Sequence, residues 1–157
     1  MKKLVPFNNA HFSKEIPKKI NKLFNSKFVQ TAAGFSYSKK CNRFIEKKLN
    51  VKKCYITNSC TAALEVAAIA INLKKGDEVI LPSYTFVSTA NAVLLRGATP
   101  VYVDIKDEDL NINEELISRL ITKKTKAIIV VHYAGFSCNM VKIKNIAKKN
   151  NIFLIED

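Results

Sequence analysis

Short apolar segments alternate with segments of helical length from residue 54 onward, and this alternation restricts the fold more than any other feature. Continuous apolar runs such as those in DEVILP and IFLIED are typical of strands buried on both faces. The pattern predicts an α/β fold with a mostly parallel sheet and helices on both faces. We expect strands over 54–59, 77–82, 99–105, 126–135 and 152–157, and helices over 61–73, 86–97, 111–121 and 139–150.

The expected helix over 61–73 is unusual because Glu65 is its only charged residue. A helix that is apolar on nearly all sides is typically buried on most of its faces. Ser59 or Thr61 can cap its first turn, and residues 74–76, Lys-Lys-Gly, supply an expected end. We therefore expect this helix to be buried on most faces.

The first 53 residues carry most of the positive charge. They hold fourteen Lys or Arg against two acids, a net charge of +12, whereas residues 54–157 hold twelve against eleven, a net charge of +1. The spacing of apolar residues predicts one amphipathic helix over 11–28 and a second over 39–49. We interpret residues 1–53 as a basic arm or helical lead-in packed on the α/β domain of residues 54–157, and not as a separate domain.

A basic arm can bind nucleic acid or another polyanion. The lysines, however, form eight doublets spread along the whole chain, with no arginine cluster and no interleaved aromatic residues that would stack on bases. The abundance of Lys, Asn and Ile is also typical of low-GC coding. We favour a solvated basic surface and expect no nucleic-acid partner; binding that weakens steeply with salt would indicate the alternative.

The composition argues against several other classes of protein. At 157 residues and 48% hydrophobic, the chain is long enough for one domain with a sizeable core. Its longest apolar run, residues 66–71, is too short to span a bilayer, and the N-terminal segment lacks the apolar core of a signal peptide. The four cysteines show no metal-ligand spacing with either histidine, so we expect reduced, packed thiols and no metal site. The expected location is the cytoplasm.

Ligands of open parallel sheets bind beyond the carboxyl ends of the strands. The first such end carries NSCTA, residues 58–62, a turn of small residues that leads into a helix. Free backbone N–H groups and the helix dipole suit such a turn to a phosphate, and the Thr61 hydroxyl can add a donor. Most turns of this kind only cap a helix, and no G-x-G-x-x-G or P-loop motif supports an ordinary nucleotide site.

The other strand ends supply residues with two interpretations each. Tyr84 and Phe86 in PSYTF can stack on a planar ring or belong to the core. Asp104 and His132 fit either catalysis or a hydrogen-bonded structural role. Asp157 follows the apolar run IFLI, and a carboxylate at the tip of a buried strand needs a partner because its desolvation is costly. A protonated ring nitrogen of a cofactor would be one such partner, and a salt-bridged arginine would be another.

Three segments stand in a specific order and spacing: SCTAALEVAAIAINLKKGDEVILPSYTFVSTANAVLLRGATPVYVDI, then LNINEELISRLITKKTKAIIVVHYAG, then NNIFLIED. Together they resemble the N-terminal part of sugar aminotransferases of the DegT/DnrJ/EryC1/StrS family. VPFN and KKCNRFIEKKL extend the likeness more loosely. The family consists of fold-type-I enzymes that depend on pyridoxal phosphate, so the resemblance implies an incomplete fold-type-I large domain. PSYTFVSTANA, VHYAG and the Cys of SCTA resemble a subgroup that acts on dTDP-linked 4-keto-6-deoxy sugars.

The resemblance implies a role for each of five residues. Cys60, Thr61 and Ala62 match the turn that holds the cofactor phosphate, and Phe86 matches the aromatic residue that stacks on the pyridine ring. Asp157 matches the acid that pairs with the pyridinium nitrogen and keeps it protonated, so that the ring acts as an electron sink. The implied reaction transfers an amino group, with glutamate as donor, to a dTDP-4-keto-6-deoxy sugar in a homodimer without a membrane partner.

Two features of the family are missing from these 157 residues. The family's catalytic lysine, which forms the Schiff base, lies beyond the aspartate in an SFHxxKN-like stretch, and none of the 23 lysines here stands in such a context. AAGF, residues 32–35, stands where family members carry a Gly-Asp-Gly-like turn. We therefore expect no turnover by this chain alone. The alternative is a non-enzymatic remnant or interaction module that associates with another chain, because an incomplete sheet exposes an edge and an apolar face.

Overall fold

The computed structural model describes residues 12–25 and 36–157. The chain divides into two compact units, Met1–Ile56 and Thr57–Asp157. The VPFN segment and the AAGF turn lie outside the described residues, so the expectations for them stay predictions.

The first unit contains the helices α1 (Glu15–Phe24) and α2 (Ser36–Leu49). Both form in the segments where the apolar spacing predicts helices. Ile16 and Ile20 stand one turn apart on α1, and no residue of α1 is buried. This helix is therefore amphipathic in sequence, but its apolar side chains stay largely exposed.

The described part of the second unit contains a parallel sheet of four strands in the order β2-β1-β3-β4. The inner strands are apolar, and Val79, Ile80 and Leu81 of β1 have no exposed surface. Such strands are expected where helices cover both faces of a sheet. The strands are β1 (Glu78–Pro82), β2 (Thr99–Val103), β3 (Thr125–Val130) and β4 (Phe153–Glu156).

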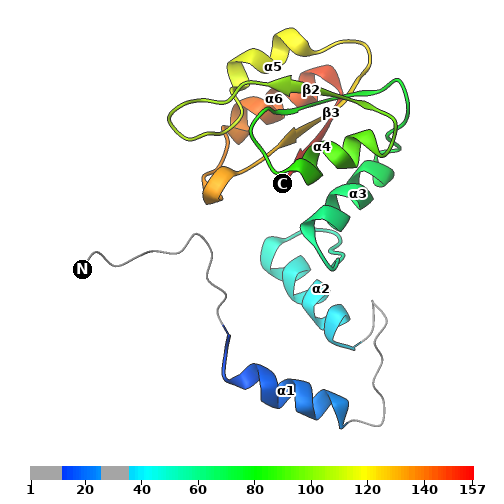
Figure 1. Ribbon diagram of the computed structural model, residues 1–157, viewed down its shortest axis with the longest axis vertical. Helices are drawn as coiled ribbons and strands as arrows, with labels where there is room; N and C mark the ends of the chain where they lie inside the picture. The colour runs from blue at the N-terminus through cyan, green and yellow to red at the C-terminus, as the bar shows by residue number, and fades with distance from the viewer. Residues whose placement is uncertain (1–11, 26–35) are drawn as a thin grey trace, which may run out of the picture. The chain divides into compact units, whose positions relative to one another are not determined.

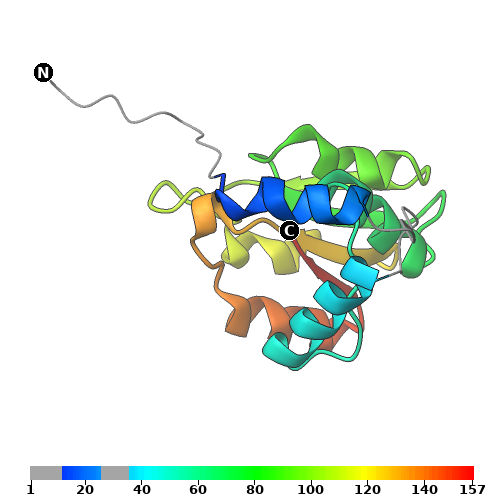
Figure 2. The same cartoon turned by 90° about the horizontal axis from the view of Figure 1, so that it is seen from below.

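Helices cover both faces of this sheet, with α3 and α4 on one side and α5 and α6 on the other (Figure 1 and Figure 2). Alternate residues of β1 point to the two faces: Val79 and Leu81 enter the core under α3 and α4, and Ile80 enters the core under α5 and α6. The predicted α/β fold, a parallel sheet with helices on both faces, is confirmed. The helices are α3 (Cys60–Ala70), α4 (Val87–Leu94), α5 (Glu114–Leu120) and α6 (Met140–Asn150), with a 3-10 turn η1 (Tyr133–Gly135) after β3.

The strand predicted over residues 54–59 is wrong, because this described segment pairs with no strand. Tyr55 is 76% exposed, and the Cys54 N–H donates to the Glu46 carboxylate of α2 at 3.0 Å. A strand needs a neighbouring strand for its backbone groups, and none is available to this segment. The described sheet therefore has four strands where the sequence pattern predicts five.

Helix α3 is apolar, as predicted, but it is not buried on most faces. Leu64 and Ala68 are buried, whereas Val66 and Ile69 are 50% and 57% exposed. The prediction is wrong because the sheet and α4 cover only one side of the helix within this unit. The predicted cap is confirmed, since the Ser59 hydroxyl accepts a hydrogen bond from a backbone N–H of the first turn at 3.1 Å.

Candidate functional site

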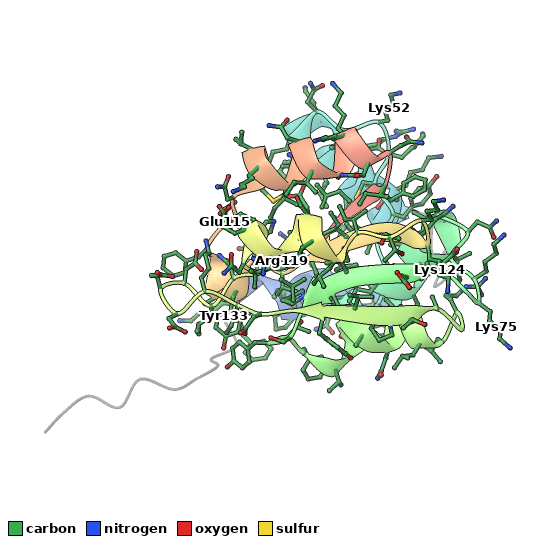
Figure 3. All side chains as sticks on the ribbon, turned by 90° about the horizontal axis from the view of Figure 1, so that it is seen from above. Lys52, Lys75, Glu115, Arg119, Lys124 and Tyr133 are labelled. Carbon is green, nitrogen blue, oxygen red and sulfur yellow. The ribbon has the colours of Figure 1, made fainter. Side chains whose placement is uncertain are left out.

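The loops that follow the parallel strands meet at the carboxyl edge of the sheet. Figure 3 shows Tyr133, which follows β3, at this edge, and shows Lys75 and Lys124, which precede β1 and β3, at the opposite edge. Asp157 directly follows β4 and reaches the same edge as Tyr133. Ligands of parallel sheets bind at this edge.

The backbone of Asp157 is fixed to the neighbouring strand. Its N–H donates to the Val130 carbonyl at 2.8 Å, and its carbonyl accepts the His132 N–H at 3.0 Å. The pairing of β3 with β4 therefore continues one residue past β4. This pairing carries the Asp157 side chain to the carboxyl edge.

Each carboxylate oxygen of Asp157 accepts a hydrogen bond from a different helix. The Thr89 hydroxyl, in the first turn of α4, donates to Oδ2 at 2.8 Å. The Cys60 thiol, at the first residue of α3, donates to Oδ1 at 3.3 Å. Thr89 is fully buried and Cys60 is exposed. Among the described residues no lysine or arginine forms an ion pair with Asp157, so the arginine alternative is not observed.

The Thr85 hydroxyl forms a hydrogen bond with the Thr89 hydroxyl. The Thr85 and Thr89 hydroxyl oxygens lie 2.9 Å apart. Each hydroxyl has one proton, and Thr89 gives its proton to the carboxylate. Thr85 must therefore donate to Thr89, and the hydrogen bonds run in one direction, from Thr85 through Thr89 to Asp157.

Asp157 also favours the protonated form of the Cys60 thiol. The hydrogen bond to Asp157 raises the pKa of Cys60, and burial and the negative charge of the carboxylate add to this effect. Only the thiolate is a strong nucleophile, so a raised pKa keeps Cys60 a neutral donor at pH 7.

The first turn of α3 has two backbone N–H groups without a protein acceptor. Within residues 12–25 and 36–157, the N–H groups of Cys60 and Thr61 find no such acceptor, whereas those of Ala62 and Ala63 donate to Ser59. Thr61 is exposed, so its hydroxyl is accessible as well. Ala62 lies in this turn, as expected, but its N–H already serves the helix cap. Free N–H groups at the positive end of a helix suit an anion.

Phe86 occupies the N-cap position of α4 and is 73% exposed. Because Thr89 follows three residues later, the exposed ring and the buried hydroxyl come from the same end of one helix. An exposed aromatic ring at this edge is available to stack on a planar ligand. Tyr84 is used differently: its hydroxyl lies 3.0 Å from that of Tyr133, and the two ring centroids are 5.0 Å apart.

Asp104 and His132 make structural contacts. Asp104 accepts a hydrogen bond from the next backbone N–H at 2.9 Å. His132 Nδ1 accepts the Cys138 N–H at 3.2 Å, so in the neutral ring the proton is on Nε2, which lies 3.2 Å from a Glu156 carboxylate oxygen. Neither side chain contacts the carboxylate of Asp157 in the described residues.

Three residues of this region, Thr85, Thr89 and Asn111, are not predicted from the sequence as functional residues. Asn111 is only 1% exposed, and its side chain accepts the Tyr133 N–H at 3.0 Å and donates to the Phe136 carbonyl at 3.2 Å, which holds the loop after β3. A threonine in the first turn of a helix gives no signal of its own. Thr85 precedes α4, so the spacing rule for residues of one helix does not indicate its contact with Thr89.

The structure also tests the expectations for the cysteines, for metal ions and for membrane-spanning helices. The cysteines are free thiols, but the expectation that they are packed holds only for Cys138, since Cys41 and Cys60 are exposed and Cys54 is half-buried. The described residues contain no group of three or more His, Cys, Asp or Glu placed to hold a metal ion. None of the helices in residues 12–25 and 36–157 has the length and apolar character to cross a membrane.

Solved structures and curated proteins resemble this chain over nearly its whole length. Spr1654 of Streptococcus pneumoniae, named as a sugar aminotransferase and solved in a PLP form, matches with a TM-score of 0.87 and 26% identity over 98% of this chain and 42% of that chain. GDP-4-keto-6-deoxymannose-3-dehydratase, solved with a trapped PLP-glutamate species, matches with a TM-score of 0.86 and 27% identity over 96% of this chain and 40% of that chain. GDP-perosamine synthase of Escherichia coli O157:H7 is 33% identical over 155 residues, which is 99% of this chain and 42% of that protein.

The fold is therefore that of pyridoxal-phosphate-dependent aminotransferases. The pattern of the DegT/DnrJ/EryC1/StrS aminotransferase family matches residues 11–157, and the chain belongs to this family. Pyridoxal phosphate is the family cofactor, and relatives have been solved in PLP and PMP forms. The chain spans 40% to 42% of the length of the three relatives described.

Proposed function

We propose that this chain provides the cofactor-binding part of a pyridoxal-phosphate-dependent aminotransferase that acts on a dTDP-4-keto-6-deoxy sugar. One observation carries the proposal. The Asp157 carboxylate is held at the carboxyl edge by α3 and α4, next to the free N–H groups that begin α3.

These residues suit the two ends of pyridoxal phosphate. The N–H groups of Cys60 and Thr61, with the Thr61 hydroxyl, would hold the phosphate at the positive end of α3. Ala62 keeps the turn small, and Phe86 would stack on the ring. Asp157 would accept a hydrogen bond from the ring nitrogen and keep it protonated. When bound, the cofactor supplies the electron sink for amino transfer.

The substrates are argued from relatives and motifs. The dehydratase relative is named for a 4-keto-6-deoxy sugar and was solved with a PLP-glutamate species, which supports this sugar class and glutamate as amino donor. PSYTFVSTANA and VHYAG resemble the dTDP-4-amino-4,6-dideoxygalactose transaminase of enterobacterial common antigen synthesis, which supports dTDP. Two relatives are named for GDP-sugars, so the assay must compare both nucleotides. A cytoplasmic homodimer completes the proposal.

Turnover by two preparations tests the proposal. One is the 157-residue chain of 17.6 kDa, and the other is the native protein, captured from its cells with an antibody against residues 54–157 and weighed intact. Each receives glutamate, pyridoxal phosphate and a dTDP- or GDP-linked 4-keto-6-deoxy sugar. We expect no conversion by the 157-residue chain, because none of its 23 lysines stands in the catalytic context. We expect a heavier native protein to convert the dTDP-sugar.

Each other outcome has a defined meaning. Turnover by the 157-residue chain well above the blank would refute the requirement for the missing lysine. A native protein that converts only the GDP-sugar would correct the nucleotide, and a heavier one that converts neither would refute the sugar proposal. An inactive native species of 17.6 kDa would favour the interaction module.

A further inference from the structure

The two carboxylate oxygens of Asp157 accept hydrogen bonds of different strength and exposure. Oδ2 accepts a 2.8 Å hydrogen bond from Thr89, which has no exposed surface. Oδ1 accepts a 3.3 Å hydrogen bond from Cys60, which is exposed. A hydroxyl is a good donor to a carboxylate and a thiol is a weak one. The bond to Oδ2 is therefore the stronger and the more protected of the two.

Thr85 further strengthens the hydrogen bond from Thr89 to Oδ2. It donates to the Thr89 hydroxyl at 2.9 Å, and hydrogen bonds in a chain polarise one another. Cys60 has no comparable support, because its only side-chain contact among the described hydrogen bonds is Asp157.

We propose that Thr89, backed by Thr85, is a positioning residue that fixes Oδ2 of Asp157 permanently, whereas Cys60 occupies Oδ1 only until the ring nitrogen of the cofactor takes that oxygen. The inference rests on the proposed function, because it requires a protonated ring nitrogen to pair with Asp157. It assigns different roles to two residues that make similar contacts.

The exchange needs no chemical step. The ring N–H donates to Oδ1 in place of the thiol, and the thiol keeps its own proton on Sγ. Oδ2 is the less accessible oxygen because it lies against the Thr89 hydroxyl, which has no exposed surface, whereas Oδ1 lies beside the exposed Cys60. Loss of the weak bond from Cys60 costs little, so the exchange favours the cofactor.

The first arm of the test is the infrared S–H band of Cys60, identified by difference from Cys60→Ala. The probe is pyridoxamine 5′-phosphate, which forms no covalent link to a lysine. In the cofactor-free chain the band should show a hydrogen-bonded thiol. Saturating probe should move the band to where it lies in cofactor-free Asp157→Ala. A band that saturating probe does not move would overturn the exchange at Cys60.

The second arm is the dissociation constant of the same probe, measured by its fluorescence. Thr89→Val should weaken binding about tenfold, because Asp157 loses a buried hydrogen bond to a charged group, and Thr89→Ser should restore it. Cys60→Ala keeps the backbone N–H and removes only the displaceable donor, so it should weaken binding less than Thr89→Val does. Thr99→Val, an exposed change at the start of β2, is the matched control.

The outcomes separate the two proposals. Loss of probe binding in Asp157→Ala, together with equal affinities of Thr89→Val and Thr99→Val, would leave the proposed function standing and overturn the role of Thr89. An Asp157→Ala variant that binds the probe like the parent chain, or a parent chain that does not bind it at millimolar concentration, would overturn both. Circular dichroism of each variant shows whether the fold is kept. If Thr89→Val does not fold, Thr85→Ala takes its place, because it removes the donor behind Thr89 and should also weaken probe binding; parent-like binding would then overturn the proposal.

Discussion

Asn111 joins two loops at the carboxyl edge of the sheet. It is 1% exposed, and its amide donates to Asp109 Oδ2 and to the Phe136 carbonyl, both at 3.2 Å, while its oxygen accepts the Tyr133 N–H at 3.0 Å. The change Asn111→Ala would leave the partly buried Tyr133 N–H and Phe136 carbonyl of the loop without these partners. We expect it to lower the free energy of unfolding by about 2–4 kcal/mol.

Urea denaturation followed by circular dichroism measures this loss. Asn145→Ala, an exposed change on α6, is the control and should stay within about 0.5 kcal/mol of the parent chain. Equal losses in the two variants would contradict the role of Asn111.

At the residue scale, the sequence indicates groups whose chemistry is uncommon at their position. Asp157 could be singled out because a carboxylate at the tip of an apolar strand requires a partner. Thr89 could not, because a threonine near a helix start is common and its contact with Asp157 joins residues 68 apart in the chain. Such a contact depends on how α4 and β4 are placed by the sheet, which single residues do not encode.

The first turn of α5 depends on a buried acid. Burial alone would raise the pKa of Glu114, but hydrogen bonds from its own backbone N–H and from Asn139, together with Lys106 at 3.5 Å, outweigh it and lower the pKa below 4.5. A carboxyl with a lowered pKa in the folded state stabilises the fold above the unfolded-state pKa and loses this contribution as the pH falls through the folded-state pKa.

We therefore expect Glu114→Gln to cost about 1 kcal/mol at pH 7, with the difference from the parent chain disappearing as the pH falls below about 4.5. Unfolding free energies between pH 7 and pH 3 check this expectation. Glu115→Gln, in the same turn but exposed, is the matched control and should change stability by less than about 0.5 kcal/mol at any of these pH values. A Glu114→Gln cost that stays constant down to pH 3 would refute the assignment.

At the scale of helices and strands, the sequence predicts where most of these elements form but not which of their sides neighbouring elements cover. Strands β1 to β4 form in segments where apolar runs predict them; burial on both faces explains the runs of the inner strands β1 and β3, whereas the edge strands β2 and β4 are only partly buried. The strand prediction for residues 54–59 is wrong because a strand needs a neighbouring strand to pair with, and Tyr55 has none. Helix α3 is identified correctly, but Val66 and Ile69 are exposed, because composition does not say how many sides of a helix its neighbours cover.

The second unit exposes apolar surface on the layer formed by α3 and α4. Exposed apolar side chains lie on α3 and at α4, and β4 is an open edge of the sheet. Surfaces and edges of this kind favour association. We expect the chain to self-associate at about 100 μM in sedimentation experiments, in keeping with the proposed homodimer. The exposed residues are Val66, Ile69, Val87, Leu94 and Leu95.

Ile69→Glu and Leu95→Glu should each weaken this association, because a charge in an apolar contact must be desolvated. Val141→Glu is the control, since Val141 is 77% exposed on α6, in the opposite layer. A parent chain that sediments as a monomer, or equal dissociation by the control, would contradict the expectation.

The contact of Cys60 with Asp157 spans 97 residues, and this span orders events during synthesis. A ribosome releases α3 and α4 before β4, so the Cys60 and Thr89 donors are present before Asp157 emerges. Strand β4 can dock only on β3, which must itself settle beside β1. Closing so long a segment is slow compared with forming a helix. Until β4 docks, the Thr89 hydroxyl and the Cys60 thiol have no Asp157 carboxylate to donate to, so the arrangement proposed to bind the cofactor forms only once β4 is in place.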